Sequence, residues 1–567
     1  MHFLKIAETG GDCFIHYIQT PFLLAYQYWA LFFPLMLARC IENEIDLDKL
    51  DNVNIVIQGG ENLKAFDKAM ITLSFLYLAL PTALFLFGWL KAPYAFILVV
   101  CLSLAMFAAI RDCESIVLCR DYRQFMRDAG AEALAVVIVV LLWTGLSGIG
   151  GFSFQNSDFL LRNAVFHDLV TFKWPVIYSY LNEQGFPPYS GHEGALVYYL
   201  SYWLPAALVG KVFGWQAANV TLYLWTVAGV LLTLYLYFRF VRKSPLMLTV
   251  VFIFWSGMDI VGELINRHIP FLGEHIEWWA RLFQYSSNTT TMYWVFNQTI
   301  SVWLAVMLLM NFKNTKSIVF TYALVLPIAP FSFIGLAPFV ITYIFLGTMS
   351  LETILKQSRL KSSILENLKQ TMNLRNIVVA PAIILVFLLY YRSNPGNLGS
   401  SGLLWSGPNG NAQTLIRYVM FCLLEFGMYS LIICDVFKRN PWFIVATISL
   451  VLIPNYYAGI YNDFVMRVSI PALFILMVYA SRFILSEDII HKNRRTKIYL
   501  IICLLIGAIT PLQEISRSVY MRLNHPDHLI ADKLGTLSVL DAKHIGAIKF
   551  YVGNDPRKSV FFKYLAK

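Results

Sequence analysis

Apolar residues fill this chain in runs of roughly 15 to 20 residues, separated by short polar connections, along almost its whole length. A helical run of that length is enough to cross the hydrocarbon core of a bilayer. The runs recur too often for a single membrane anchor. The pattern therefore predicts an all-α polytopic membrane protein of about 13–14 transmembrane helices.

Two of these runs need interpretation. Ile318–Met349 is broken by prolines, and we expect it to form a short helical hairpin. Phe14–Ala38 is also cut by prolines and either crosses or lies in the interface, so the side of the N-terminus stays open. The remaining expected crossings are Met70–Gly88, Pro93–Ile110, Ala131–Ile149, Ala218–Phe238, Leu246–Val261, Met292–Met310, Ile377–Tyr391, Tyr418–Cys434, Trp442–Tyr457, Val468–Leu485 and Ile498–Pro511.

Basic residues gather between these runs, and the positive-inside rule places such clusters in the cytoplasm. The clusters span Arg120–Arg127, Arg239–Lys243, Lys313–Lys316, Lys356–Arg375, Lys438–Arg439 and Lys492–Lys497. An even number of crossings must then separate neighbouring clusters, and the apolar runs satisfy this requirement. The segments expected on the outer face are the loops 151–217, 262–291, 392–417 and 455–467 and the tail 512–567.

Three domains follow from this topology: an N-terminal membrane region (1–130), a transmembrane core (131–511) and a short extracytoplasmic tail (512–567). Gly194–Gly214 would break the parity if it crossed the bilayer. We expect it to lie at the outer face as a partly embedded helix with its tyrosines and tryptophan at headgroup depth. The acidic segment IENEIDLDKLDN (41–52) is expected in the cytoplasm, and the tail is expected to pack on the outer loops.

Composition supports a membrane protein: 58% of the residues are hydrophobic, 14% are charged and the mean hydropathy is +0.61. The formal net charge is +10, but the excess lies beside apolar runs, so it indicates topology and contact with anionic lipid rather than nucleic-acid binding. The eight cysteines show neither metal-ligand spacing nor a disulfide framework. No cleavable signal peptide is evident at the N-terminus.

Gly151–Glu193 is the polar stretch around which the rest of the chain is organised. If Ser157 caps a helix, Asp158 and Arg162 stand at i, i+4 on one face. Asp168 then lies about 80° round from Asp158, near enough to line one cavity edge. A carboxylate held against low-dielectric walls is a suitable general base for a hydroxyl acceptor. The alternative is an interfacial helix on which Asp158 and Arg162 merely pair. Candidate substrate-binding residues here are Arg162, His167, Lys173 and Trp174.

A large first outer loop with an early acid, followed by the Tyr-rich segment LVYYLSYWLPAALVGKVFG, resembles the GT-C superfamily of membrane glycosyltransferases. The resemblance covers roughly Ala131–Pro511, is mostly architectural and points to a bacterial-type branch. It implies a GT-C-like bundle whose first outer loop contains interfacial helices, and sugar transfer from a polyprenyl-phosphate or pyrophosphate carrier on the outer face. Asp158 would then activate the acceptor, with Asp168 as the second catalytic candidate. Asp158 lacks an acidic neighbour, so no metal requirement is expected. The reaction is further expected to be inverting and to use no cofactor.

The second outer loop mixes charged and aromatic residues that suit a sugar and its phosphate. Aromatic rings stack on sugar C–H faces, and guanidinium groups bind phosphate in a bidentate manner. The alternative is an aromatic belt with snorkelling cations. The candidate substrate-binding residues are Arg267, Trp278, Trp279 and Arg281. In the fourth loop, Asp463 and Arg467 stand at i, i+4, either as a helix-start ion pair or, in the case of Arg467, as the preferred phosphate ligand.

These observations lead to a glycosyltransferase, of hexosyl or pentosyl type, in the inner (plasma) membrane with its active face extracytoplasmic. The expected partners are a lipid-linked sugar donor, membrane lipid and an envelope glycan, lipid or protein acceptor, as in polysaccharide biosynthesis; no nucleic acid is expected. A nucleotide site is not expected either, because no Gly-rich phosphate loop follows a strand. A transporter or flippase, or a polymerase or ligase of lipid-linked glycans, remains the alternative. A transporter needs ionisable residues deep in its spans, and the spans look nearly free of them.

Overall fold

A computed structural model describes most of the chain beyond the N-terminal region. The described residues are 53–112, 120–179, 193–347, 360–394, 401–406, 410–459, 462–485, 494–525, 538–541 and 548–567. The interpretations of Phe14–Ala38 and of the acidic segment 41–52 fall outside these ranges.

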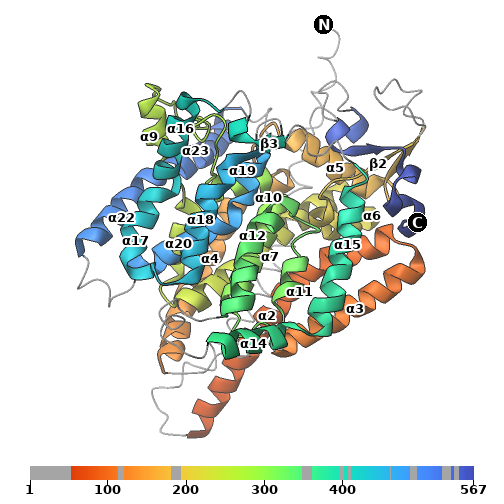
Figure 1. Ribbon diagram of the computed structural model, residues 1–567, viewed down its shortest axis with the longest axis horizontal. Helices are drawn as coiled ribbons and strands as arrows, with labels where there is room; N and C mark the ends of the chain where they lie inside the picture. Colours follow the sequence, from red (N-terminus) through yellow and green to blue (C-terminus); the bar gives the residue numbers. More distant parts are fainter. Residues whose placement is uncertain are drawn as a thin grey trace.

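The described chain is a bundle of helices, and the prediction of a polytopic helical membrane protein is confirmed (Figure 1). Its longer helices are α2 (Val53–Trp89), α3 (Ala92–Asp112), α4 (Arg120–Leu146), α7 (Trp215–Val241), α8 (Pro245–Phe254), α10 (Asn288–Asn311), α12 (Pro330–Leu346), α14 (Leu360–Thr371), α15 (Ala380–Tyr391), α16 (Ala412–Cys422), α17 (Met428–Phe437), α18 (Pro441–Leu452), α20 (Ile470–Leu485), α22 (Arg494–Gly507) and α23 (Ile509–Asn524).

Fewer of these helices are long enough to cross a membrane than the sequence suggested. Among the described residues, 7 helices have the necessary length and apolar composition, or 8 if the pair Lys361–Thr371 and Arg375–Tyr391, bent by 72°, is one span. Shorter apolar helices account for most of the other expected crossings. The predicted hairpin Ile318–Met349 contains only a short α11 (Ile318–Ala323) before α12, because prolines remove backbone donors and interrupt the helix.

The bundle is organised around α10. Within the most apolar stretch of α10, 94% of the residues are buried, whereas 22% are buried in the corresponding stretch of α3. A helix buried on all sides lies in the core, and one with an exposed apolar face is suited to contact lipid. α10 is interrupted at Val295, whose φ of −137° and ψ of 35° are not helical. Its first turns and the rest of the helix therefore follow different directions.

Helices α2 and α3 form the expected N-terminal hairpin, joined at Leu90, and they pack against each other. The C-terminus closes onto this turn: Leu90 bridges to Ala566, and the backbone N–H of Lys567 donates to the carbonyl of Trp89 at 2.9 Å. The tail thus contacts the first helical hairpin of the described chain.

Two small sheets lie at one end of this mostly helical bundle. One sheet has the order β1 (Ile177–Ser179), β2 (Glu193–Leu196), β5 (Val552–Asn554), and the other pairs β3 (Ser401–Leu403) with β4 (Tyr456–Ala458), all antiparallel. These segments are too short for sequence periodicity to detect, since their pairing comes from chain segments far apart. Pairing of β2 with β5 packs the tail on the first loop, as the sequence suggested.

The prediction of one interfacial helix over Gly194–Gly214 is wrong in its first half. Residues 193–196 form β2, and the helix α6 covers only Leu204–Phe213. The aromatic residues of this segment, Tyr198, Tyr199, Tyr202 and Trp203, are buried inside the protein instead of lying in a lipid interface. Tyr198 and Tyr199 contact residues of other loops, Tyr551 and Arg467 respectively.

Figure 1 shows α5, α9, α16, α19 and β3 at the upper end of the bundle and α14 at the lower end. We call the upper end the loop end, because α5 (Phe159–Thr171), α9 (Asp259–Ile265), α19 (Asp463–Val468) and both sheets lie there. Every polar loop that the sequence placed on a single side of the membrane contributes to it.

Candidate functional site

The first half of the site is the start of α5. Asn156 Oδ1 accepts a hydrogen bond from the backbone N–H of Asp158 at 3.1 Å, and the helix begins at Phe159. Asp158, not Ser157, occupies the N-cap position, without a capping side-chain bond. One helical turn on, Arg162 Nη2 donates to Asp158 Oδ2 at 2.6 Å. The predicted i, i+4 pair is therefore present.

Arg162 is buried although it carries a charge. Its side chain is 7% exposed, whereas that of Asp158 is 45% exposed. The guanidinium lies 6.0 Å from the ring centroids of Phe159 and Phe296, a distance at which an aromatic face attracts a cation. Arg162 Nη1 is buried and has no hydrogen-bond partner among the described residues. An unsatisfied buried donor is costly, so this nitrogen is suited to an acceptor from a ligand.

The second half of the site repeats this arrangement on α19. Arg467 Nη2 lies 3.0 Å from Asp463 Oδ1, and Nη1 donates to the hydroxyl of Tyr199 at 2.5 Å. The Arg467 side chain is 10% exposed and that of Asp463 39%. Arg467 Nε is buried without a partner in the described chain. In both halves the guanidinium lies inside and the carboxylate faces outward.

Tyrosines join the two halves into one cluster. Burial raises the pKa of Tyr199, and the nearby positive charges of Arg467 and Arg162 oppose that rise. Burial also raises the pKa of Tyr551, on which Arg162 and Asp158 act from nearby. The rings of Tyr198 and Tyr551 pack against each other, with centroids 4.5 Å apart and planes tilted by 38°. We call this cluster the paired-arginine site; its members are Asp158, Arg162, Tyr198, Tyr199, Asp463, Arg467 and Tyr551.

The charges of the two halves act on one another. Burial works to lower the pKa of Arg467, but Asp463, Tyr199, Tyr198 and Asp158 outweigh it and raise that pKa. Asp158 on α5 and Arg467 on α19 are therefore within electrostatic range, although more than 300 residues separate them in the chain. Two buried guanidinium groups with open donors, beside half-exposed carboxylates, can hold an anionic group and offer a base to its neighbour.

Asp168 does not line one cavity edge together with Asp158, which was the expectation from the sequence. It is fully buried, and its Oδ2 accepts hydrogen bonds from the Tyr178 hydroxyl at 2.6 Å and from Ser538 Oγ and Val539 N, both at 3.0 Å. These donors come from β1 and from the tail, so Asp168 holds the tail against α5. His167 Nδ1 is 3.9 Å from Asp168 Oδ1, which is too far for a hydrogen bond.

The other candidates of the first loop lie near Asp168. His167 Nε2 is 3.3 Å from Thr171 Oγ1, and Lys173 is exposed. Trp174 donates from Nε1 to the carbonyl of Leu169 at 2.8 Å and packs on Trp89, the last residue of α2, with ring centroids 5.4 Å apart. Trp174 thus has a structural contact with the N-terminal hairpin.

The second-loop candidates lie around α9, and no contact among the described residues brings them to the paired-arginine site. Arg267 and Arg281 are exposed, and both have left-handed backbone conformations with φ of 60° and 58°. Trp278 is 55% exposed. Trp279 is buried and donates from Nε1 to Glu425 Oε1 at 2.9 Å, so it offers no free ring face for a sugar.

Sequence reasoning missed the tyrosines of the site and Phe296, whose ring lies against Arg162. Tyr198 and Tyr199 stand in the Tyr-rich segment that we assigned to the lipid interface, and Tyr551 stands in the tail. The sequence offered one signal for these tyrosines. Aromatic residues are dense in a segment that lies between two segments with buried charges. The spatial approach of the tail depends on the β2–β5 pairing, which no local pattern reveals.

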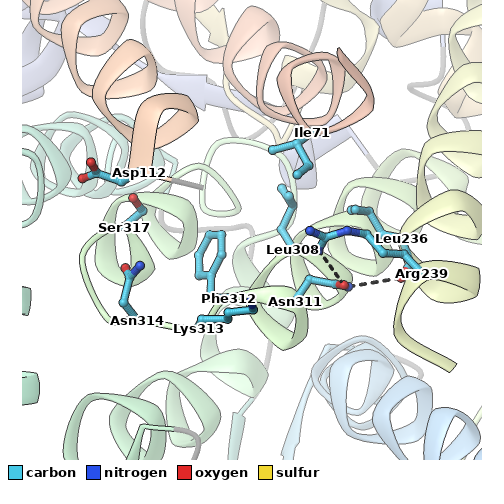
Figure 2. Close-up of a pocket in the computed structure, with 10 residues that line it drawn as sticks. All are labelled: Ile71, Asp112, Leu236, Arg239, Leu308, Asn311, Phe312, Lys313, Asn314 and Ser317. Atoms are coloured by element: carbon cyan, nitrogen blue, oxygen red, sulfur yellow. Dashed lines mark hydrogen bonds between the residues drawn. The ribbon is translucent and has the colours of Figure 1, made fainter. Parts of the chain in front are cut away.

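A pocket at the opposite end of the bundle is a poor candidate. Figure 2 shows it lined by Arg239, Asn311, Lys313 and Asp112 among others, where α7 and α10 end. Its volume of about 20 Å³ has room for about one water molecule. Arg239 is bound to Asp67 at 2.9 Å and to Asn311 at 3.0 Å, so these charges already have partners. We interpret it as a packed ion-pair region.

Comparison with known protein families, curated proteins and solved structures gives no match to this chain. Its function is therefore argued from its own residues.

Proposed function

We propose that this membrane protein is a glycosyltransferase that moves a sugar from a polyprenyl-phosphate or pyrophosphate carrier to an envelope glycan, lipid or protein. The observation that carries the proposal is the paired-arginine site. Arg162 and Arg467 each keep one buried N–H donor without an acceptor in the described chain, and Asp158 lies beside them with its carboxylate partly exposed. Such a site is suited to a phosphate next to a reacting hydroxyl.

The chemistry requires a base and a stabilised leaving group. Asp158 accepts the proton of the acceptor hydroxyl as its oxygen forms a bond to the anomeric carbon of the sugar. The bond from that carbon to the carrier phosphate breaks, and the phosphate leaves with both electrons. Arg162 and Arg467 stabilise the negative charge on the leaving phosphate, which is the charge that develops in the transition state. Attack from the face opposite to the phosphate inverts the anomeric configuration.

The direct test is transfer by the purified full-length protein in lipid, using a labelled polyprenyl-phosphate sugar and extracted acceptors. Asp158→Asn keeps the shape of the side chain but removes the base, so turnover should fall on the order of 10²–10⁴-fold while donor binding remains. Asp435→Asn is the matched control, because Asp435 pairs with a lysine on the helix surface and its side chain is 91% exposed. Near-normal turnover of Asp158→Asn contradicts the assigned base.

A deletion strain tests the reaction class independently of any variant. Loss of a transferase should leave its lipid-linked donor accumulating, and the accumulated lipid identifies the sugar. An unchanged lipid-linked sugar profile contradicts the proposal.

The proposed active face is extracytoplasmic. A tag at Lys567, which lies against the end of α2, is expected outside, and a tag at Lys361 on α14 is expected in the cytoplasm. Accessibility labelling of both tags in intact cells checks this. If both tags are on the same side, the topology on which the proposal rests is wrong.

The alternative of a transporter or flippase is stronger than the sequence suggested. The expectation that the spans are nearly free of ionisable residues is wrong, because Asp259 and Glu425 are buried within the candidate spans Pro245–Ile265 and Ala412–Phe437. A transporter moves an unchanged lipid across the membrane, whereas a transferase releases a carrier without its sugar. Chemical analysis of the carrier after incubation with the protein separates the two functions.

A further inference from the structure

A second cluster of buried charge lies at the loop end, away from the residues proposed for catalysis. Asp259 begins α9 after the break that separates it from α8, and Glu425 lies in the π-helical segment Leu423–Gly427. Glu277 comes from the loop between α9 and α10. All three residues are 1% exposed. We call Asp259, Glu277 and Glu425 the acid cluster.

Two of these carboxyl groups lie close to one another. The carboxyl groups of Asp259 and Glu425 interact electrostatically, and two neighbouring buried carboxyl groups are stabilised when they share a proton. Asp259 Oδ2 accepts hydrogen bonds from Ser256 Oγ at 3.2 Å and Thr510 Oγ1 at 2.8 Å. Asp259 Oδ1 and Glu425 Oε2 are buried and have no hydrogen-bond partner among the described residues. They are therefore the atoms available to share a proton.

The backbone packs closely around this contact. An added Cβ at Gly257 would lie 1.9 Å from Glu425 Oε2, so only glycine leaves room for the carboxyl group there. Trp279 Nε1 donates to the other oxygen, Glu425 Oε1, at 2.9 Å. The irregular segment before α9 and the π-helical turn thus hold the two acids together. Irregular turns of this kind inside helices are frequent at functional sites.

Glu277 links the cluster to the start of α10. Its Oε1 accepts from the backbone N–H of Ser287 at 2.9 Å, and its Oε2 accepts from Gln284 Nε2 at 3.0 Å. Burial, followed by the charge of Asp259, raises the pKa of Glu277 to about 7. His275 acts in the opposite direction. The carboxyl group of Glu277 consequently changes its protonation state near neutral pH.

The nearby cations do not neutralise the cluster. His275 Nδ1 is 2.8 Å from Glu514 Oε1, and Arg517 is bound to the other oxygen of Glu514, so both cations face that acid on α23. In the described chain no lysine or arginine forms a salt bridge with Asp259, Glu277 or Glu425. Nor do the described residues include a group of three His, Cys, Asp or Glu arranged to hold a metal ion.

We propose that the acid cluster is a proton-binding site, which holds protons at neutral pH and loosens the loop 266–287 when they leave. Each deprotonation adds a negative charge to a buried group of acids, and Asp259, Glu277 and Glu425 then repel one another. The repulsion is relieved when the loop moves away, since Glu277 is the member that the loop contributes. This property goes beyond the proposed transfer reaction and does not depend on it.

The test uses the full-length protein in lipid nanodiscs. Infrared spectra taken from about pH 5 to about pH 9 should show the band of protonated carboxyl groups at neutral pH, and the band should fall as the pH rises. Glu277→Gln and Glu425→Gln should each remove part of it. Glu274→Gln is the control in the same loop, because Glu274 is paired with His268 at 2.9 Å and should contribute nothing. The titration of the unsubstituted protein tests the proposal even if a variant fails to fold.

Hydrogen exchange gives the structural readout. After correction for intrinsic rates, the opening of residues 276–290 should increase on the order of 10–100-fold through this pH range, and Glu277→Gln should suppress most of the increase. The proposal is overturned if no protonated carboxyl band is present at neutral pH. It is also overturned if added Na⁺ or Mg²⁺ displaces the band at constant pH, because the site would then bind a metal cation.

Discussion

Two regions at the loop end bury charge, and they compensate it in different ways. The paired-arginine site sets each guanidinium against its own carboxylate, Arg162 against Asp158 and Arg467 against Asp463. The acid cluster gathers carboxyl groups, and the nearby cations His275 and Arg517 are bound to Glu514 instead. Opposite charges offset burial by their own attraction, whereas like charges need protons or an added cation. The stability of the paired-arginine site should therefore depend on its side-chain charges, and the stability of the acid cluster should depend on pH.

The largest expected effect breaks the arginine pairing. Arg467→Gln leaves Asp463 without its partner and removes the hydrogen bond to Tyr199, so the free energy of unfolding should fall by about 3 kcal/mol. Transfer should fall on the order of 10²–10³-fold, because a donor to the leaving phosphate is lost. Thermal unfolding in nanodiscs and the transfer assay measure the two effects.

The matched substitution in the acid cluster sharpens the contrast. Glu425→Gln replaces a protonated carboxyl group with a neutral amide of similar shape, so the free energy of unfolding at neutral pH should change by less than about 1 kcal/mol. The comparison between the two regions fails if Glu425→Gln destabilises the protein as much as Arg467→Gln does.

The second prediction concerns the pH dependence of stability. The pKa of Glu277 is raised from 4.5 to about 7 in the folded protein, so its contribution is fully present below pH 4.5 and is lost as the pH rises through 7. The loss amounts to at most about 3 kcal/mol. Glu277→Gln should flatten most of this decline in unfolding experiments across that range. A decline that the substitution leaves unchanged assigns the pH dependence to other groups.

His275 should leave a smaller dependence in the same direction. Burial works to lower its pKa, but the hydrogen bond and charge of Glu514 raise it above the ordinary value. Protonated His275 therefore stabilises the fold at low pH, and this stabilisation is also lost as the pH rises. The double variant Glu277→Gln, His275→Gln should be flatter than Glu277→Gln alone.

The third prediction separates Asp168 from both regions. Asp168→Asn weakens the bonds to Tyr178, Ser538 and Val539, so the tail should loosen at a cost of about 1–2 kcal/mol. Limited proteolysis should cleave the chain near residues 538–541 more readily, while transfer should fall less than in Asp158→Asn. If Asp168→Asn abolishes transfer with the tail still protected, Asp168 has a role in catalysis.

The last prediction is that removal of divalent cations has no effect on transfer. Transfer should survive removal of divalent cations by EDTA, because the proposed reaction stabilises the leaving phosphate with Arg162 and Arg467. Abolition by EDTA with rescue by Mg²⁺ or Mn²⁺ contradicts this prediction. The same titration checks the acid cluster, whose infrared band should not respond to the chelator.

The parts of the structure that could be predicted from the sequence are local. Apolar runs predicted the helices, and i, i+4 spacing predicted the pairs Asp158–Arg162 and Asp463–Arg467. Both depend on residues within one or two turns, where geometry follows from helix periodicity. Span lengths were less accurate, because prolines and π-helical turns shorten a helix without interrupting its apolar pattern.

The long-range contacts could not be predicted in this way. Tyr551 reaches the site only through pairing of strands from opposite parts of the chain, and Trp279 is buried by its contact with Glu425. The acid cluster did leave a signal. Asp259 and Glu425 each stand within an apolar run, and an acid in such a position is costly unless it has a function or a partner.

The segment of α10 around its interruption at Val295 contacts residues of both regions. On the acid side of the helix, the backbone N–H of Ser287 donates to Glu277, and Trp294 donates to Glu514. On the other side, Phe296 lies over the guanidinium of Arg162. Residues 287–296 thus form a short segment in contact with both.

A segment shared in this way imposes a thermodynamic symmetry. If release of protons moves it and changes the affinity of Arg162 for an anion, then binding of that anion must change the proton affinity of Glu277 by the same factor. Proton uptake or release on addition of a phosphate-bearing lipid would thus report occupancy of the arginines from the far side of α10, without any chemical turnover.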